Sequence, residues 1–109
     1  MSALVTQQAH FLLSACKLIE FATAQGHKVT GGELERTAEQ AALYAQQGKG
    51  IVNSMHCQRR AIDLNFYDKL GALKADKVSL EPIGKYWESL GGTWGGRFTK
   101  LDDSRHFEM

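Results

Sequence analysis

The chain has few of the features that mark several large classes of protein. Its 109 residues include only two cysteines and one proline. Cys16 and Cys57 lie far apart with no Cys-x-x-Cys pair, which excludes a disulfide framework and a zinc site built from thiolates. A run of about 18 apolar residues, which a membrane-spanning helix needs, is also missing. Any bound metal must therefore be held by histidines and carboxylates.

The chain also has no large excess of positive or negative charge. Thirteen Lys and Arg side chains oppose twelve Asp and Glu side chains, which leaves a net charge of +1. This balance provides no basic footprint for a phosphate backbone, so nucleic-acid binding is not expected. The first residues have neither the basic nor the apolar segment of a secretory signal, so we expect synthesis in the cytoplasm without a signal peptide or membrane anchor. The length predicts a single domain, 1–109, whose modest core would gain from a metal.

Helical patterns dominate the first half of the chain. Apolar residues recur at helical spacing over 4–24 and predict a helix that Gly26 ends. Residues 27–30 follow as a short strand. The sequence Thr-Ala-Glu-Gln at 37–40 has the form of a capping box, in which the Thr hydroxyl and the Gln side chain satisfy free amides, and it predicts a second helix that continues to 44–47.

Strand patterns come later. Over 61–67 the apolar residues alternate, so that Ile62, Leu64 and Phe66 share one face while Asp63 points to the other. We expect a loop over 68–80, a short helix over 83–90, and strands over 94–98 and 106–109. Helices followed by strands predict an α+β fold, in which N-terminal helices pack on a small antiparallel sheet.

Two of the four histidines stand near carboxylates. His56 precedes Asp63 by seven positions, so these two side chains can meet only across a turn. Asp103 precedes His106 by three positions, and Glu108 shares the face of His106 in a strand. Two histidines and one aspartate would supply the ligands of a catalytic zinc and leave a position for water. A remaining carboxylate would take the proton of that water.

Other conspicuous residues have structural as well as functional interpretations. Trp94 could form a wall of a substrate groove, or it could belong to the core. Cys57 is expected to point away from any metal. His10 and His27 have no acidic partner at helical spacing, so surface or capping roles are expected for them.

Three sequence segments together resemble a known family. They are Ser54-x-His56 followed by Asp63, the Leu-Gly-Gly-x-Trp-Gly-Gly segment at 90–96, and Asp103-x-x-His106-Phe-Glu. In this order they resemble the zinc peptidases of the D-alanyl-D-alanine carboxypeptidase superfamily, and in particular the phage endolysins that act as L-alanyl-D-glutamate endopeptidases. The segment from Arg36 to Tyr44 is similar as well, so that the resemblance extends from about Val29 to the end.

The resemblance implies a role for individual residues. The implied ligands of Zn²⁺ are His56, Asp63 and His106. Asp103 would act as general base and later as general acid, and Arg36 would bind the substrate carbonyl and stabilise the oxyanion. Ser54 falls at a substrate-contacting serine. The chain departs from the family at Arg59, where many members have glycine, which affects expectations of pocket shape near His56. A surface cation is the alternative interpretation of Arg36.

The implied function is hydrolysis of an amide bond in the peptide stem of peptidoglycan, with the L-alanyl-D-glutamate bond as the expected site. We expect a monomeric phage-type lysis enzyme that is made in the host cytoplasm and reaches the wall through a separate membrane pore. Two alternatives remain open: a D-alanyl-D-alanine dipeptidase or carboxypeptidase, and a non-catalytic, zinc-stapled module that binds the cell wall.

Overall fold

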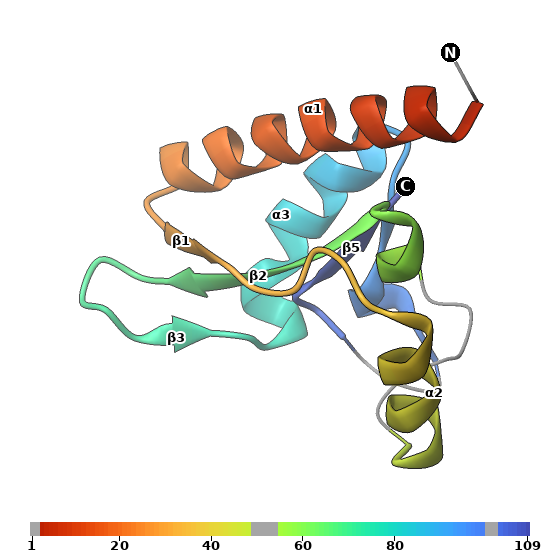
Figure 1. The fold of residues 1–109 in the computed structure, drawn as a ribbon. Helices are drawn as coiled ribbons and strands as arrows, with labels where there is room; N and C mark the ends of the chain where they lie inside the picture. Colours follow the sequence, from red (N-terminus) through yellow and green to blue (C-terminus); the bar gives the residue numbers. More distant parts are fainter. Residues whose placement is uncertain (1–2, 49–54, 100–102) are drawn as a thin grey trace.

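Helices and an antiparallel sheet make up the part of the chain that the computed structural model describes, which is residues 3–48, 55–99 and 103–109 (Figure 1). The helices are α1 (Ala3–Ala24), α2 (Ala38–Gln46) and α3 (Lys77–Ser89). The strands are β1 (Lys28–Gly31), β2 (Ala61–Tyr67), β3 (Leu73–Lys74), β4 (Thr93–Trp94) and β5 (His106–Glu108). Two short 3₁₀ segments, η1 (Met55–Gln58) and η2 (Gly95–Arg97), complete the described elements. The predicted α+β class is confirmed.

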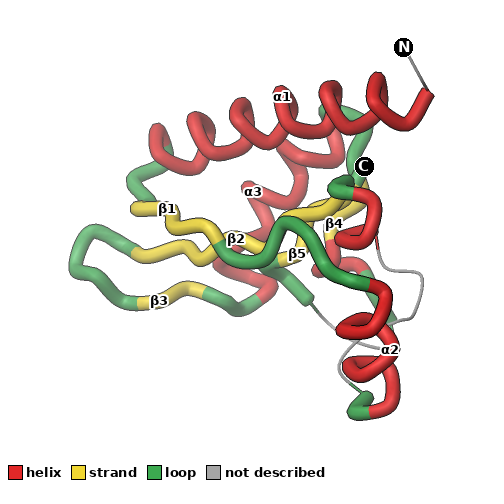
Figure 2. Tube along the Cα trace, viewed as in Figure 1, coloured by secondary structure: helices red, strands yellow, loops and turns green. Residues whose placement is uncertain are grey.

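The sheet runs in the order β1-β2-β5-β4, with β3 also paired to β2, and every pairing is antiparallel. In Figure 2 the strands lie together beneath α1, while α2 lies away from the sheet, beyond the loop that follows β1. β2 is the central strand because it pairs with three others. The register places Asp63 of β2 directly opposite His106 of β5.

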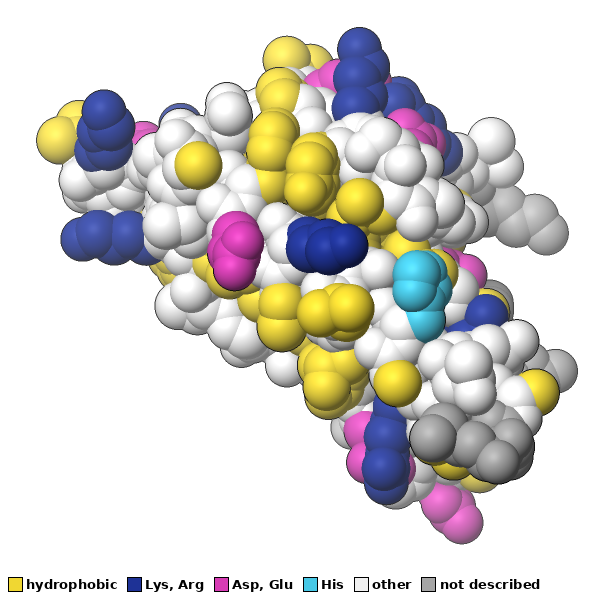
Figure 3. All heavy atoms as spheres, turned by 90° about the horizontal axis from the view of Figure 1, so that it is seen from above, with side chains coloured by type: hydrophobic (Ala, Val, Ile, Leu, Met, Phe, Trp, Pro, Cys, Tyr) yellow, Lys and Arg dark blue, Asp and Glu magenta, His cyan; other side chains and the backbone are white. Residues whose placement is uncertain are grey.

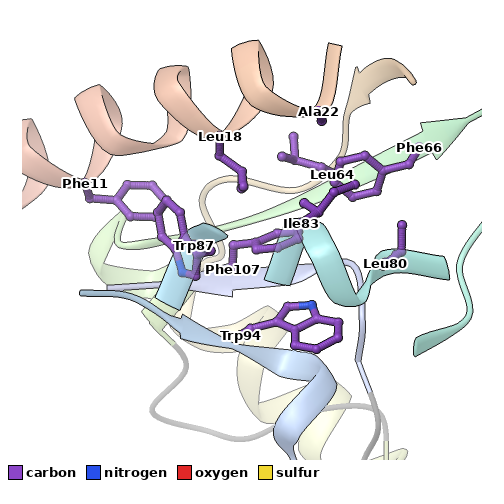
Figure 4. Packing of buried hydrophobic residues seen from close by; sticks show 10 residues of the cluster. All are labelled: Phe11, Leu18, Ala22, Leu64, Phe66, Leu80, Ile83, Trp87, Trp94 and Phe107. Carbon is purple, nitrogen blue, oxygen red and sulfur yellow. The ribbon is translucent and has the colours of Figure 1, made fainter. Parts of the chain in front are cut away.

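One face of the sheet packs against α1 and α3. Leu64, Phe66 and Phe107 are fully buried there, and Ile62 packs against the same cluster. Figure 4 shows the α1 side chains Phe11 and Leu18 pointing toward this layer. The other members of the buried cluster are Ala22, Leu80, Ile83, Trp87 and Trp94. Since side chains alternate along a strand, Asp63 and His106 point to the opposite face.

Local sequence signals explain most element boundaries. Gly26 follows the end of α1 as predicted, and the amide of His27 donates to the carbonyl of Ala22 across this turn. The Thr37 hydroxyl accepts from the amide of Gln40 at the start of α2, as the capping box predicts. The Gln40 side chain donates from its Nε2 atom to the Tyr44 hydroxyl, one turn further along α2.

Two boundaries in the second half of the chain differ from expectation. α3 begins at Lys77, six residues earlier than the predicted helix, because Asp76 caps it by accepting a hydrogen bond from the amide of Ser79. The expected strand over 94–98 is limited to the two residues of β4, because the chain turns into η2 at Gly95. A Cβ at Gly95 would collide with the carbonyl oxygen of Asp103, so only glycine allows this close approach.

The outer face of α1 carries exposed apolar side chains. Figure 3 looks down on this face, where hydrophobic side chains gather among single charged ones. The large exposed apolar residues of α1 are Leu4, Val5, Leu12 and Leu13. No helix within the described ranges has both the length and the apolar character needed to cross a membrane.

Candidate metal and catalytic site

Three side chains converge on the face of the sheet opposite the core. His56 comes from η1, Asp63 from the middle of β2 and His106 from the start of β5. The Nε2 atom of His56 lies 3.2 Å from Nδ1 of His106. Oδ1 of Asp63 lies 3.3 Å from each of these two nitrogens. Residues far apart in the sequence thus place one donor atom each at the corners of a nearly equilateral triangle.

The spacing of this triangle fits a zinc ion. Ligands at about 2.05 Å from a tetrahedral zinc lie about 3.3 Å from one another. The donor set, two imidazole nitrogens and one carboxylate oxygen, is also one that zinc accepts while a fourth position stays open. The described chain therefore contains a group of three donors that is able to bind zinc.

The second nitrogen of each imidazole has its own partner. Nε2 of His106 lies 2.7 Å from Oε1 of Glu108, and Nδ1 of His56 lies 3.3 Å from the carbonyl oxygen of Leu34. When these nitrogens carry the protons, the two facing nitrogens keep their lone pairs for a metal. Glu108 thus supports the imidazole of His106 from the side away from the triangle.

Carboxylates dominate the electrostatics of the site. Burial by itself raises the pKa of Asp63, but hydrogen bonds and charge from His106 and His56 outweigh it and hold this pKa well below its usual range. Burial lowers the pKa of His106, yet the carboxylates of Asp63 and Glu108 outweigh burial and raise it to about 9. The site favours a cation at its centre.

Asp103 lies beside the triangle without being a corner of it. Its Oδ2 atom is 4.0 Å from Nδ1 of His106, and its side chain is about one-third exposed. Burial, followed by the negative charge of Asp63, raises the pKa of Asp103. A half-buried carboxyl group whose pKa is raised toward neutrality is suited to accept a proton and return it.

Arg36 lies in the loop between β1 and α2 and contacts the backbone of His56. Its backbone amide donates to the carbonyl of His56 at 3.1 Å, and its Nε atom donates to Oε1 of Glu33 at 2.6 Å. The guanidinium lies over the ring of Tyr44, 5.0 Å from the ring centroid. Arg36 is only 10% exposed in its side chain, so it is not the surface cation of the alternative interpretation.

The expectation that Trp94 contacts substrate is wrong. The indole is fully buried in the core, and its Nε1 atom donates to the carbonyl of Ser104 at 2.8 Å. The aromatic side chain beside the site is Phe98, which is 37% exposed and whose ring lies 5.6 Å from that of His106. Phe98 follows the Gly95-Gly96 pair in the sequence, whereas sequence reasoning singled out Trp94, which precedes this pair.

The remaining residues were either singled out in the sequence or missed there, and none of them is a corner of the triangle. Ser54 lies outside the described residues. Cys57 is not among the converging ligands, and its Sγ atom faces the carbonyl of Thr37 at 3.9 Å. Arg59 has a φ of 55°, the left-handed conformation that favours glycine, which agrees with the glycine that the family resemblance implies at this position. Glu33 was missed by sequence reasoning, although an acidic residue three positions before Arg36 is a detectable signal.

Comparisons with known proteins point to one family. The sequence profile of the family described as D-alanyl-D-alanine carboxypeptidase matches residues 47–109, more than half of the chain. No curated protein matches the chain. The crystal structure of the L-Ala D-Glu endopeptidase ChiX of Serratia marcescens superposes with a TM-score of 0.65 at 19% identity, covering 84% of this chain and 74% of that chain. At this identity the likeness concerns the fold.

Proposed function

The chain belongs to the D-alanyl-D-alanine carboxypeptidase family of zinc peptidases, and on this premise we propose that it hydrolyses the L-alanyl-D-glutamate bond in the peptide stem of peptidoglycan. The observation that carries the proposal is the triangle formed by His56, Asp63 and His106, with Asp103 beside it. The fold shared with an L-Ala D-Glu endopeptidase supports the choice of bond. A phage lysis enzyme is the biological role that this choice favours.

In the proposed mechanism His56, Asp63 and His106 hold the zinc ion. Bound there, zinc would lower the pKa of water to about 7 and polarise the scissile carbonyl group. The Asp103 carboxylate takes a proton from the attacking water and transfers it to the leaving amine nitrogen. The water oxygen bonds to the carbonyl carbon, the amide C–N bond breaks, and the products are the carboxylate of alanine and the free amine of glutamate.

Arg36 would serve the same step. Its permanent positive charge would donate hydrogen bonds to the carbonyl oxygen as negative charge develops on it, and loss of one such donor typically costs about 3 to 4 kcal/mol. Glu108 and the Leu34 carbonyl keep the two imidazoles in the orientation that zinc needs. Ser54 is proposed as a contact to the substrate.

Mass spectrometry of peptidoglycan digested by the zinc-loaded protein tests this proposal. We expect a new alanine carboxyl terminus on the glycan side and a new amino-terminal D-glutamate on the released peptide. Release of free D-alanine would support the alternative that the family description favours, a D-alanyl-D-alanine carboxypeptidase. Binding of peptidoglycan fragments without any cleavage would contradict both and favour a wall-binding module.

A further inference from the structure

The segment from Gly32 to Arg36, here called the strap, lies between β1 and α2, and its first residues continue along the edge of β2 (Figure 1). The amide of Gly32 donates to the carbonyl of Asp63 at 2.7 Å, and the amide of Asp63 donates to the carbonyl of Glu33 at 2.9 Å. A Cβ at Gly32 would stand 2.7 Å from the Asp63 carbonyl oxygen, so glycine is required there. The strap is therefore fixed against the strand that carries a metal ligand.

The strap is fixed to His56 as well. The Leu34 carbonyl lies 3.3 Å from Nδ1 of His56, and the Arg36 amide donates to the His56 carbonyl at 3.1 Å. Backbone hydrogen bonds to both residues leave the strap little freedom to move relative to the site. Side chains on the strap consequently have a rigid base, which precise positioning of a functional group requires.

Glu33 uses this rigid base to hold Arg36. The hydrogen bond from Arg36 Nε to Glu33 Oε1 is charge-assisted and half-buried, since the Glu33 side chain is 24% exposed and that of Arg36 is 10% exposed. The ring of Tyr44 lies against the guanidinium. Within the described ranges, Nε is the only guanidinium nitrogen of Arg36 that has a hydrogen-bond partner. Its two Nη groups remain for another acceptor.

His56 is a weaker partner for Glu33. The Glu33 carboxylate is 3.8 Å from Nδ1 of His56, beyond hydrogen-bond distance, and this nitrogen already faces the Leu34 carbonyl. The hydrogen bond between Arg36 and Glu33, at 2.6 Å, is stronger than the contact between His56 and Glu33, at 3.8 Å. Glu33 therefore acts mainly on Arg36.

We propose that Glu33 is a positioning residue, which clamps Arg36 through Nε so that its Nη groups are preorganised for the carbonyl oxygen of the scissile bond. This inference rests on the proposed peptidase function. An unclamped arginine would lose side-chain entropy in each catalytic cycle and would sample orientations that cannot reach the oxygen. Glu33 therefore acts on the transition state through Arg36 and makes no contact of its own with the substrate.

Kinetics of the Glu33→Ala variant on a stem peptide test this inference. We expect kcat to fall about 10- to 100-fold while KM changes little, because a small misplacement of a catalytic group has an effect of this order. Glu33→Gln keeps the size of the side chain and an acceptor oxygen, so it should retain more activity than Glu33→Ala. Glu35→Ala is the matched control. It removes an acidic side chain that is half-exposed and pairs with Arg59 at 3.1 Å, and it should keep wild-type kinetics.

A double-variant cycle separates positioning from a structural role. In an Arg36→Ala background, the further change Glu33→Ala should lower kcat less than about twofold, because the group that Glu33 positions is already missing. Zinc affinity, measured by competition with a chelator, should stay within about threefold of wild type in both Glu33 variants. An equal loss in both backgrounds, or a zinc affinity that falls together with activity, would overturn the inference.

The outcome also distinguishes this inference from the function on which it rests. Wild-type activity on stem peptides combined with unchanged kinetics of Glu33→Ala would overturn only the positioning role. A zinc-loaded wild-type protein that cleaves no stem peptide would overturn the proposed function, and the role of Glu33 with it.

Discussion

Asp63 and His106 face each other across the antiparallel pair of β2 and β5, and Oδ1 of Asp63 lies 3.3 Å from Nδ1 of His106. This register pair belongs to the polar face of strands whose other face is the core. Packing of Leu64 and Phe107 beneath the sheet therefore fixes the positions of two metal-site residues above it. A shift of β5 by one residue would turn His106 toward the core and away from Asp63.

Glu108 should control the zinc affinity through His106. Glu108→Gln replaces the carboxylate that lies 2.7 Å from Nε2 of His106 with a neutral amide. Partners of metal-bound histidines typically contribute 10- to 100-fold to metal affinity, and we expect a loss in this range. Competition with a fluorescent zinc chelator measures it. Unchanged affinity would mean that Glu108 does not orient the imidazole of His106.

Zinc should stabilise the fold as well as serve the reaction. Its proposed ligands tie η1 to β2 and β5, so binding to the folded state alone raises the free energy of unfolding. We expect a chelator to lower Tm of the wild-type protein by several degrees, as differential scanning calorimetry would record. His56→Ala is the control, and its Tm should not respond to the chelator. An unchanged wild-type Tm would limit zinc to a catalytic role.

Position 59 should be one of the few at which glycine gives a more stable protein than alanine. A non-glycine residue in the left-handed region costs roughly 1 to 2 kcal/mol, and Arg59 has a φ of 55°. We therefore expect Arg59→Gly to have a free energy of unfolding about 1 kcal/mol higher than Arg59→Ala, although both lose the ion pair with Glu35. Urea denaturation of the two variants compares them. A more stable alanine variant would contradict the strain at this position.

Asp76 should make the stability of α3 depend on pH. Its carboxylate accepts a hydrogen bond from the amide of Ser79, and this bond lowers the pKa of Asp76 below its ordinary value of 3.8. A lowered pKa stabilises the folded state above pH 3.8, and the contribution is lost as the pH falls further. Asp76→Ala should thus lower Tm at pH 6 and have a smaller effect at pH 2.5. An equal difference in Tm at both pH values would contradict this cause.

Local signals made much of the fold predictable. Helical spacing and Gly26 predicted α1, Thr37 predicted the start of α2, and alternation predicted β2 with its bounds. The start of α3 was missed because the cap at Asp76 lies in a segment without clear hydrophobic periodicity. β3 has only two residues, a length at which alternation carries no information.

The sequence allowed most residues of the site to be predicted, but not all of the contacts that they make. The spacing of His56, Asp63, Asp103 and His106, with the family resemblance, identified side chains that the fold brings together. Trp94 was misjudged because only the packed core shows that its indole is enclosed. The spacing of Glu33 to Arg36 was visible in the sequence, but the contact of the two side chains depends also on the backbone hydrogen bonds of the strap, which the sequence does not show.

The central claim is a zinc peptidase in which Asp103 performs proton transfer beside a metal held by His56, Asp63 and His106. Its most direct test measures bound zinc and stem-peptide hydrolysis on the same samples of wild type, Asp103→Asn and His56→Ala. We expect Asp103→Asn to keep its zinc and to lose about 100-fold or more in activity, the range of general acid–base catalysis. His56→Ala should lose both. Full activity in either variant, or hydrolysis by metal-free wild type, would contradict the account.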